Sequence, residues 1–396
     1  MPENNTNLFI TPAQFAAEVK PLKTAAFAGV SDAAYKDATD RMTALLHAIA
    51  DAEAGTEGSV APTSWAQVQD IVRAGLADRF FSIGDQLTCQ CGNDTLVWDV
   101  IGIDHDIPAD PQFTHSMTLP LHDCCPTTIQ FDAPEAFYYC ENALEAGTYH
   151  FAIDSTDYQF TLASDVAAGS QLILTFTSDV PTSLSVSATV GGAVSGDPVA
   201  VTAGSGGTAL NAGGLNHIDR VKRGSNRYKE SAIRQWLNSS EAAGSVWSAQ
   251  NNFDRPPSWA ADTDGFLNGM GADFLAVIGN ATKVTSRNTV TDGGGFDTTT
   301  EKFFLLSRRE VYAGVESNVN ESQPYPYYAN YSDLSAAGMG ADTNRIKYLN
   351  STKKYWWLRT PFYGGSINVG VIRYAGEFDY NYAYGSYGIA PACNII

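Results

Sequence analysis

The spacing of apolar residues changes near residue 80, and this change limits the chain to a mixed fold. Before it, apolar side chains such as Met42, Leu45 and Ile49 recur every three or four residues, which is the spacing of an amphipathic helix. After it, short runs alternate apolar with polar residues and are separated by turn residues, which is typical of antiparallel strands. The sequence therefore predicts an α+β protein with a small helical region at residues 1–80.

Three helices are expected in this N-terminal region. The first begins at Thr11, where the sequence matches a capping box with proline at the first helical position. The second ends at Gly55, and the third runs from a cap at Ser64 to Leu76. Short helices bury little apolar surface alone, so we expect the region to pack on the rest of the chain, on other copies in a homotrimer, or on an attachment partner.

Further along the chain, a hairpin is predicted from residues 81–87 and 95–103, turning at residues 92–94. Strand patterns at residues 150–153, 158–162, 171–176 and 183–190 predict an antiparallel β-sandwich. Glycine-rich stretches after residue 203 mark its exit. Helices are then expected at residues 228–238, with Ser225 as N-cap, and at residues 264–270.

Charge and hydropathy exclude several classes of partner. The formal net charge of −19 argues against nucleic acid and against anionic membranes, because like charges repel. No segment approaches the ~18–20 apolar residues of a membrane span. The N-terminus has neither a basic region nor an apolar core, so we expect no secretory signal and synthesis in the cytoplasm.

The six cysteines leave two interpretations open. Cys89 and Cys91, together with His122, Cys124 and Cys125, offer ligands for zinc, but their spacing is not that of a zinc knuckle. Buried free thiols are the alternative that we favour. The loop from Asp292 to Asp297 could be either a calcium site or a glycine turn, and the glycine turn is favoured. Asp104, His105 and Asp106 could form either a metal site or a solvated loop, and the solvated loop is favoured. We therefore expect no metal and no cofactor.

The C-terminal forty residues combine two strands, at 355–361 and 388–395, with a polar aromatic segment between them. This segment is rich in tyrosine, serine, glycine and asparagine, the residues that dominate antibody paratopes. Tyr380, Tyr382 and Tyr384 alternate, so one face of a strand would carry all three. An exposed face is favoured over a packed sheet edge, because a core face would more often use Val, Ile or Leu. Ile367, Val369, Val371 and Ile372 are predicted to form an inner strand.

The motifs Y-W-W-L-R-T-P and G-I-A-P-A-C-N-I near the C-terminus resemble the end of bacterial and phage domains of the C-type lectin-like class, which are similar to the formylglycine-generating fold. The helix R-Y-K-E-S-A-I-R-Q-W-L-N and the strand I-G-D-Q-L near residue 83 fit the same class. The resemblance covers about residues 82–125 and 215–396. It implies a C-type lectin-like domain at 81–125 and 206–396, with the β-sandwich inserted at 126–205.

Some members of that class are variable proteins of diversity-generating retroelements. The resemblance implies a ligand- or receptor-binding protein, either a phage tail adhesin in the virion or a protein of the bacterial cell surface. The expected partners are a host-cell surface protein or glycan and, through the N-terminal region, other virion proteins. The implied ligand-binding residues are Phe362, Tyr363, Ser366, Asn368, Arg373, Tyr374, Phe378, Asp379, Tyr380, Asn381, Tyr382, Tyr384 and Tyr387.

The fixed scaffold below them is expected to comprise Trp356, Trp357, Leu358, Pro361, Ile389 and Pro391. Arg359 is either an interior ion-pair partner or a surface contact, and the interior role is favoured because Arg359 lies between apolar scaffold residues. Two other functions remain as alternatives: a structural virion protein that buries the tyrosine face in an oligomer interface, and a formylglycine-generating-type enzyme. Cys393 has no second cysteine nearby, which departs from the cysteine pair of those enzymes. No G-x-S-x-G, P-loop or H-E-x-x-H motif is present, and no histidine follows His217, so we expect no enzymatic activity.

Overall fold

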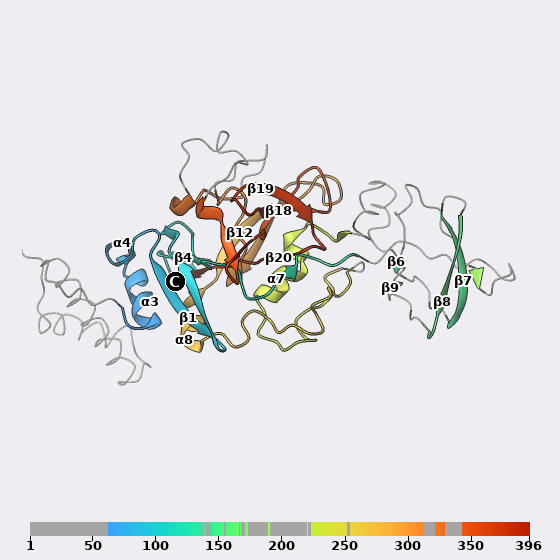
Figure 1. The fold of residues 1–396 in the computed structure, drawn as a ribbon, viewed down its shortest axis with the longest axis horizontal. Helices are drawn as coiled ribbons and strands as arrows, with labels where there is room; N and C mark the ends of the chain where they lie inside the picture. The colour runs from blue at the N-terminus through green and yellow to red at the C-terminus, as the bar shows by residue number, and fades with distance from the viewer. Residues whose placement is uncertain are drawn as a thin grey trace, which may run out of the picture. The chain divides into compact units, whose positions relative to one another are not determined.

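The computed structural model describes residues 62–135, 220, 223–251, 254–311, 321–328 and 343–396, with short stretches between 138 and 190 (Figure 1). It divides into two compact units, Met1–Phe80 and Phe81–Ile396. The first two predicted helices lie outside the described residues. Among the described residues, no helix is both long and apolar enough to cross a bilayer.

In the smaller unit, the predicted cap at Ser64 is confirmed. Its hydroxyl accepts a hydrogen bond from the Gln67 amide, and α3 follows at Trp65–Arg73, with α4 at Ala77–Phe80. We expected this helix to continue to Leu76. It ends at Arg73 instead, because Gly75 takes a left-handed conformation at φ 68°. The Gly75 amide donates to the Val72 carbonyl, and the Leu76 amide donates to the Ile71 carbonyl. These two bonds form a Schellman motif at the end of the helix.

The central sheet of the larger unit joins segments that are far apart in the sequence. The C-terminal strand β21 (Ala392–Ile395) pairs with β4 (Met117–Pro120) on one side and with β11 (Ile278–Gly279) and β14 (Phe303–Phe304) on the other. A short strand, β3 (Gly102–Ile103), continues the sheet beyond β4. All pairs are antiparallel, and every residue of β21 and β4 is buried. The early and late parts of the chain therefore share one core.

Hairpins flank this sheet. The predicted first hairpin is confirmed as β1 (Gln86–Cys91) and β2 (Asp94–Asp99), and Gly92 makes the turn at φ 58°. Its first strand begins later than expected, since the Asp85 carboxylate accepts from the Ser82 amide and closes a turn there. A second hairpin joins β12 (Ala281–Ser286) to β13 (Phe296–Glu301), and a short one joins β15 (Lys347–Leu349) to β16 (Thr352–Lys354).

The predicted aromatic segment forms a three-stranded antiparallel sheet. Its strands are β17 (Trp356–Pro361), β18 (Asn368–Ile372) and β19 (Phe378–Tyr382), in that order, and β18 and β19 are labelled in Figure 1. The predicted inner strand is confirmed, because β18 is the middle strand and its apolar side chains are buried. Next along the chain, β20 (Ser386–Tyr387) pairs with β5 (Ile129–Gln130).

Helices are few in the larger unit. The predicted helix near residue 230 is split into a 3-10 turn, η1 (Tyr228–Glu230), and α7 (Ala232–Leu237). Its N-cap is Ser231, whose hydroxyl accepts from the Arg234 amide, so the prediction of Ser225 is wrong. The helix expected at 264–270 is also wrong: those residues form turns, and α8 begins at Ala272 and ends at Val277. Gly265 lies so close to the Ser239 carbonyl that a Cβ would sit 2.2 Å from it, which suits a turn and not an exposed helix. Two further 3-10 turns are η2 (Pro326–Tyr328) and η3 (Thr343–Arg345).

Within the predicted insertion, the described strands pair antiparallel. They are β6 (Tyr138–Tyr139) with β9 (Gln171–Leu172), and β7 (Gly147–Ile153) with β8 (Thr156–Leu162) and β10 (Thr189–Val190). Most of residues 136–219 lies outside the described residues, so the sandwich and its boundaries stay predictions. The described part of the chain is an α+β protein built mostly from small antiparallel sheets.

Candidate binding surface

The scaffold below the C-terminal sheet is rigidly packed. Trp356 and Trp357 are fully buried, and their indole N–H groups donate to the Arg345 and Ile129 carbonyls at 2.9 Å. The other scaffold residues that the sequence predicted, Leu358, Pro361, Ile389 and Pro391, are buried as well. The prediction of a fixed core here is confirmed.

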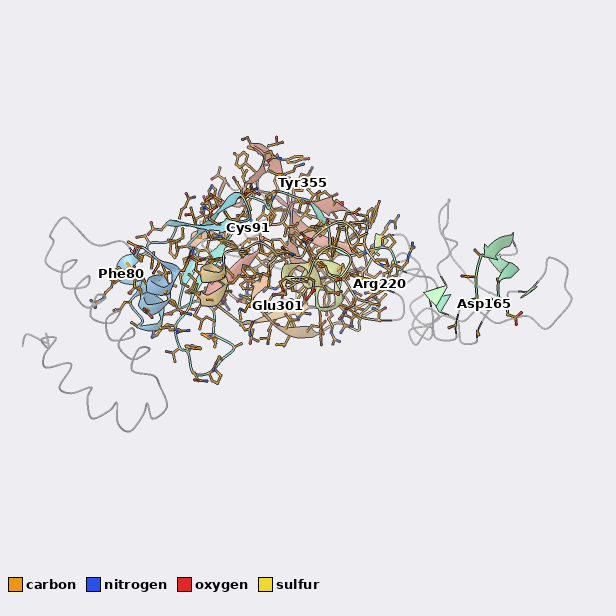
Figure 2. The ribbon with its side chains drawn as sticks, turned by 90° about the horizontal axis from the view of Figure 1, so that it is seen from below. Phe80, Cys91, Asp165, Arg220, Glu301 and Tyr355 are labelled. Atoms are coloured by element: carbon orange, nitrogen blue, oxygen red, sulfur yellow. The ribbon has the colours of Figure 1, made fainter. Side chains whose placement is uncertain are left out.

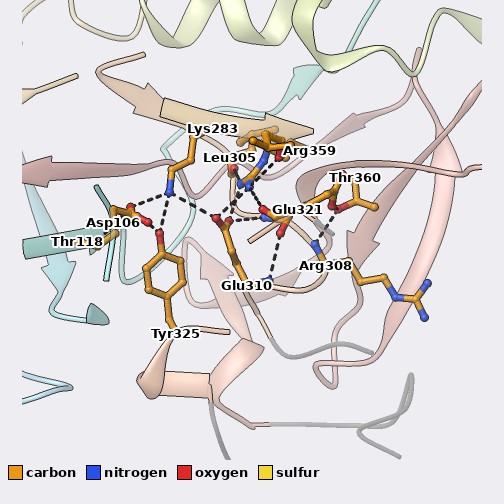
Figure 3. A network of polar contacts seen from close by, with 12 residues as sticks. Asp106, Thr118, Lys283, Leu305, Arg308, Glu310, Glu321, Tyr325, Arg359 and Thr360 are labelled. Carbon is orange, nitrogen blue, oxygen red and sulfur yellow. Dashed lines mark hydrogen bonds and ion pairs between the residues drawn. The ribbon is translucent and has the colours of Figure 1, made fainter. Parts of the chain in front are cut away.

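A buried polar network crosses this core (Figure 3). Arg359 donates from both terminal nitrogens to Glu310, at 2.5 and 2.9 Å, which confirms its interior ion-pair role. Lys283 links Glu310 to Asp106, at 3.4 and 2.7 Å. The Tyr325 hydroxyl donates to the same Asp106 carboxylate at 2.8 Å. The solvated-loop interpretation is therefore wrong for Asp106, whose side chain is only 7% exposed.

This network stays ionised at neutral pH. Burial alone would raise the carboxyl pKa values of Asp106 and Glu310, because a low dielectric disfavours charge. At Asp106 the Lys283 ammonium, together with hydrogen bonds from His105 and Asn394, outweighs that effect. At Glu310 the Arg359 guanidinium and the Lys283 ammonium do so together. Both pKa values consequently lie below their usual range. A pocket of about 490 Å³ opens beside the network at His105, Lys283 and Gln323, but the carboxylates that line it already accept hydrogen bonds from within the protein.

Above the scaffold, five tyrosines form a row that we call the aromatic surface. They are Tyr374, Tyr355 and Tyr387, whose rings contact one another, followed by Tyr384 and Tyr382, whose rings contact each other. Burial raises the pKa of the Tyr387 hydroxyl, and Tyr384 lies near enough to raise it further. Ring centroids are 4.3 Å apart for Tyr355 and Tyr374, 5.9 Å for Tyr355 and Tyr387, and 6.1 Å for Tyr382 and Tyr384. Tyr374, Tyr382 and Tyr384 are 55%, 38% and 42% exposed. The row thus presents aromatic rings to solvent.

The inner members of the row are fixed from below and from the side. Tyr387 packs edge-on against Trp357 at 4.9 Å, and the Asn381 side chain hydrogen-bonds its hydroxyl. A Cβ on Gly385 would meet the Tyr387 ring at 2.7 Å, so glycine is required there for the ring to lie flat against the loop. The rings are therefore held in place before any partner arrives, which lowers the entropy cost of binding.

Two arginines stack on the rings. The Arg373 Nε donates to the Tyr355 hydroxyl at 2.7 Å, and its guanidinium faces Asp379 at 3.6 Å. The guanidinium of Arg223 lies 4.6 Å from the ring centroid of Tyr382. The sequence did not single out Arg223 or Tyr355 for binding. Arg223 lies more than 150 residues before Tyr382, so no local pattern signals the contact, whereas Tyr355 was assigned to the scaffold strand.

The structure corrects three predicted site residues. Ser366 and Phe378 are 1% and 3% exposed, so neither can touch a partner in this conformation. Phe378 is covered because it packs on Tyr380, at 4.8 Å, below the Arg308 guanidinium. Tyr380 is half-buried in that cluster with Phe362, at 5.1 Å, so it does not join Tyr382 and Tyr384 as expected.

The remaining predicted residues lie on or beside the turn between β17 and β18. Phe362, Tyr363 and Asn368 are half-buried there. The turn is held by the fully buried Asn226, whose side-chain amide donates to the carbonyls of Phe362, Gly365 and Asn368. Their positions leave part of each side chain available at the edge of the aromatic surface.

Two segments that lie on either side of residues 136–219 in the sequence adjoin the segment that carries Tyr382 and Tyr384. One ends at Glu135 and the other begins at Arg220, and the Glu135 amide donates to the Arg220 carbonyl at 3.0 Å. Upstream, the Asp132 amide donates to the Ala383 carbonyl at 3.0 Å; downstream, the Arg223 carbonyl accepts from the Tyr384 amide at 2.9 Å. We call residues 132–135, 220, 223 and 224 the neck; Arg220 is labelled in Figure 2.

The neck contains buried acids. Arg220, 6% exposed, donates to both oxygens of Asp292 at 3.0 Å and faces Glu135 at 3.7 Å. Burial, opposed in part by Arg220 and reinforced by Asp254 and other acids, raises the Glu135 pKa to about 7. Burial likewise raises the pKa of Asp254 to about 6 and that of Asp132 well above its usual range.

These shifts predict that lowering the pH from 8 to 5 stabilises the larger unit. A carboxyl whose pKa is higher in the folded than in the unfolded state binds more protons when folded, so its contribution is complete below the unfolded pKa and is lost as the pH rises through the folded pKa. For Glu135 that window runs from 4.5 to about 7. Thermal unfolding at several pH values should show the gain, and Glu135→Gln should flatten it. The control Glu241→Gln, at an exposed position, should leave the pH dependence unchanged. If the parent and the Glu135→Gln variant show the same dependence of stability on pH, the raised pKa of Glu135 is not its cause.

The other candidate metal sites have competing partners. The Trp98 indole donates to Cys89 Sγ at 3.2 Å, and burial raises the pKa of Cys89 to about 11 and that of Cys124 to about 12. Cys89, Cys124 and Cys125 are buried, as the buried-thiol interpretation expects, whereas Cys91 is half-buried. In the 292–297 loop, Asp292 pairs with Arg220 and Asp297 with Arg227, at 2.9 Å. Both carboxylates are thus ion-paired with arginines, an arrangement that is compatible with the glycine-turn interpretation of this loop.

Comparison with known protein families matches residues 210–396 to a domain family described as a domain of unknown function, DUF6273. The matched range includes the aromatic surface, Arg220 and the buried Arg359–Glu310 pair. No curated protein and no solved structure matches the chain.

Proposed function

We propose that this chain is a recognition protein whose aromatic surface binds a partner at a cell surface. The observation that carries the proposal is the row of exposed rings at Tyr374, Tyr382 and Tyr384 on a scaffold of buried tryptophans. Tyrosine offers a large contact area at a low cost in rotamer entropy, and it adds one hydroxyl for hydrogen bonding. Fixed rings of this kind suit binding without rearrangement of the backbone.

The finer assignments belong to the same proposal. We propose a C-type lectin-like arrangement for residues 81–125 and 206–396, with residues 1–80 serving attachment or oligomerisation. The partner is a host-cell surface protein or glycan, and the chain acts in a phage virion as a tail adhesin, or else on the bacterial surface. The buried Arg359–Glu310–Lys283–Asp106 network supports binding over catalysis, because its ionised groups pair with one another.

Binding to intact cells tests the proposal. The full-length chain, fluorescently labelled, is applied to a panel of bacterial cells, and binding is compared for the parent and for Tyr382→Ala/Tyr384→Ala. We expect the double variant to bind at least about tenfold more weakly, as for removal of a central aromatic anchor. Its melting temperature should stay close to that of the parent, because both rings are well exposed.

Ile83→Ala is the matched control, because it removes an exposed apolar side chain outside the aromatic surface. It should bind like the parent. Equal binding by the double variant would overturn the proposal. A change of oligomeric state in the double variant, measured by light scattering, would favour the alternative of a structural protein that buries its tyrosines between subunits.

A further inference from the structure

The chemistry of the aromatic surface allows a narrower statement about the partner, one that rests on the proposed function. We infer that the aromatic surface binds an uncharged glycan chain, with the sugar rings lying on the row from Tyr374 to Tyr382. Three properties of the surface carry this inference: its charge, its lack of exposed aliphatic side chains, and the spacing of its rings.

The charge of the surface is balanced. The Arg373 guanidinium lies near the carboxylates of Glu377 and Asp379, and the Arg223 guanidinium lies over the Tyr382 ring. Two cations thus face two anions here, whereas the whole chain carries a formal charge of −19. An anionic polymer would be repelled by the rest of the molecule without gaining a net cationic site. An uncharged ligand avoids this repulsion.

The surface is aromatic and polar but not aliphatic. Val369, Val371 and Ile372 of β18 are fully buried, and Ile367 is 8% exposed. What is at least partly exposed is phenol rings, the Asn381 amide, the Glu377 and Asp379 carboxylates, and the Arg223 and Arg373 guanidinium groups. The core of a protein–protein interface is depleted of charged groups, whereas charged pairs and amides among the rings suit the hydroxyl groups of a sugar.

The ring spacing suits a chain of sugars. Ring centroids lie 4.3 to 5.9 Å apart among Tyr374, Tyr355 and Tyr387, and 6.1 Å apart for Tyr384 and Tyr382, distances comparable with the length of one sugar ring. The C–H groups on the flat side of a sugar are weakly positive and are attracted to the negative face of an aromatic ring. The Asp379, Asn381 and Arg373 side chains beside the rings can then exchange hydrogen bonds with sugar hydroxyls.

Chemical treatment of the cells distinguishes a glycan from a protein partner. Cells that bind the parent chain are divided into three samples: untreated, oxidised with periodate and then reduced with borohydride, and treated with protease. Periodate cleaves vicinal diols of sugars, so we expect binding to fall at least about tenfold after oxidation. Binding to polysaccharide extracted from the same cells provides a second measurement and should depend on the same tyrosines.

The outcomes separate this inference from the proposed function. Loss of binding after protease alone, or no binding to the extracted polysaccharide by a chain that still requires Tyr382 and Tyr384 on cells, would overturn the glycan assignment and leave the proposed function standing. Binding to cells that does not depend on these tyrosines would overturn both.

Side-chain substitutions add a test of the contact itself. Tyr382→Phe keeps the ring face and should retain binding within about threefold of the parent, whereas Tyr382→Leu should lose about tenfold. Stacking on a sugar requires the aromatic face, and an aliphatic side chain of similar size does not replace it. If Tyr382→Leu binds the extracted polysaccharide as well as Tyr382→Phe does, sugar stacking at this ring is wrong.

Discussion

Replacing Glu310 with glutamine is expected to lower the free energy of unfolding of residues 81–396 by about 3–5 kcal/mol, the cost of breaking a buried ion pair from one side. Glu310 holds both terminal nitrogens of Arg359, and both side chains are fully buried. The substitution keeps the size and most of the hydrogen-bonding capacity of the side chain but removes its charge. Arg359 is then left charged in a dry environment without its ionic partner.

Urea unfolding followed by tryptophan fluorescence measures this loss, because Trp356 and Trp357 lie shortly before Arg359 on the same strand and are buried. Asp379→Asn is the matched control: it removes an acid from an ion pair whose two side chains are each 47% exposed, so little change is expected. A Glu310→Gln variant as stable as the Asp379→Asn variant would mean that the network does not hold the core together.

Replacing Arg220 with methionine is expected to have a similarly large effect, about 3–5 kcal/mol, at the neck. Methionine fills the buried space but leaves Asp292, whose side chain is 6% exposed, without its guanidinium partner. The Arg220 Nε also donates to the Ser366 carbonyl at 3.4 Å, in the turn below the aromatic surface. We therefore expect binding to cells to weaken together with stability, although Arg220 itself is buried.

Arg220→Lys separates charge from geometry. A lysine keeps the positive charge but cannot donate to both oxygens of Asp292 in the fixed geometry of a guanidinium, so its loss of stability should fall between the parent and Arg220→Met. Urea unfolding and cell binding are measured for all three proteins. Unchanged stability in Arg220→Met would show that the neck is held by its backbone bonds alone.

Local patterns in the sequence were sufficient wherever a single segment carries the signal. The cap at Ser64, the hairpin turn at Gly92 and the buried strand β18 were all predicted, because capping, left-handed turns and alternation depend on residues close together in the chain. The interior role of Arg359 was also predicted, from its position between apolar scaffold residues. The helix prediction at residues 264–270 failed where a distant segment approaches closely, as Ser239 does at Gly265. The N-cap prediction failed because a second local serine, Ser231, caps the helix instead of Ser225.

The candidate site was only partly predictable. The sequence located a tyrosine-rich segment, but it did not determine which side chains face solvent: Ser366 and Phe378 lie inside, and Tyr380 joins a separate cluster. These outcomes depend on the partners Phe362 and Arg308, which approach from outside β19. The sequence of one strand determines only which of its side chains share a face. Whether that face is exposed depends on the residues from other segments that pack against it.

By itself, then, the sequence determined the α+β composition, the acidic charge and the aromatic character of the C-terminal segment, since these are properties of residue types and their local spacing. Only the tertiary structure brought Arg223 over Tyr382, buried Asp106 against Lys283, and placed both segments of the neck beside the same loop. Those contacts join residues that are separated by tens to hundreds of positions. Whether these contacts form depends on how the whole chain packs its core. The spacing of apolar residues along a short segment does not determine that packing.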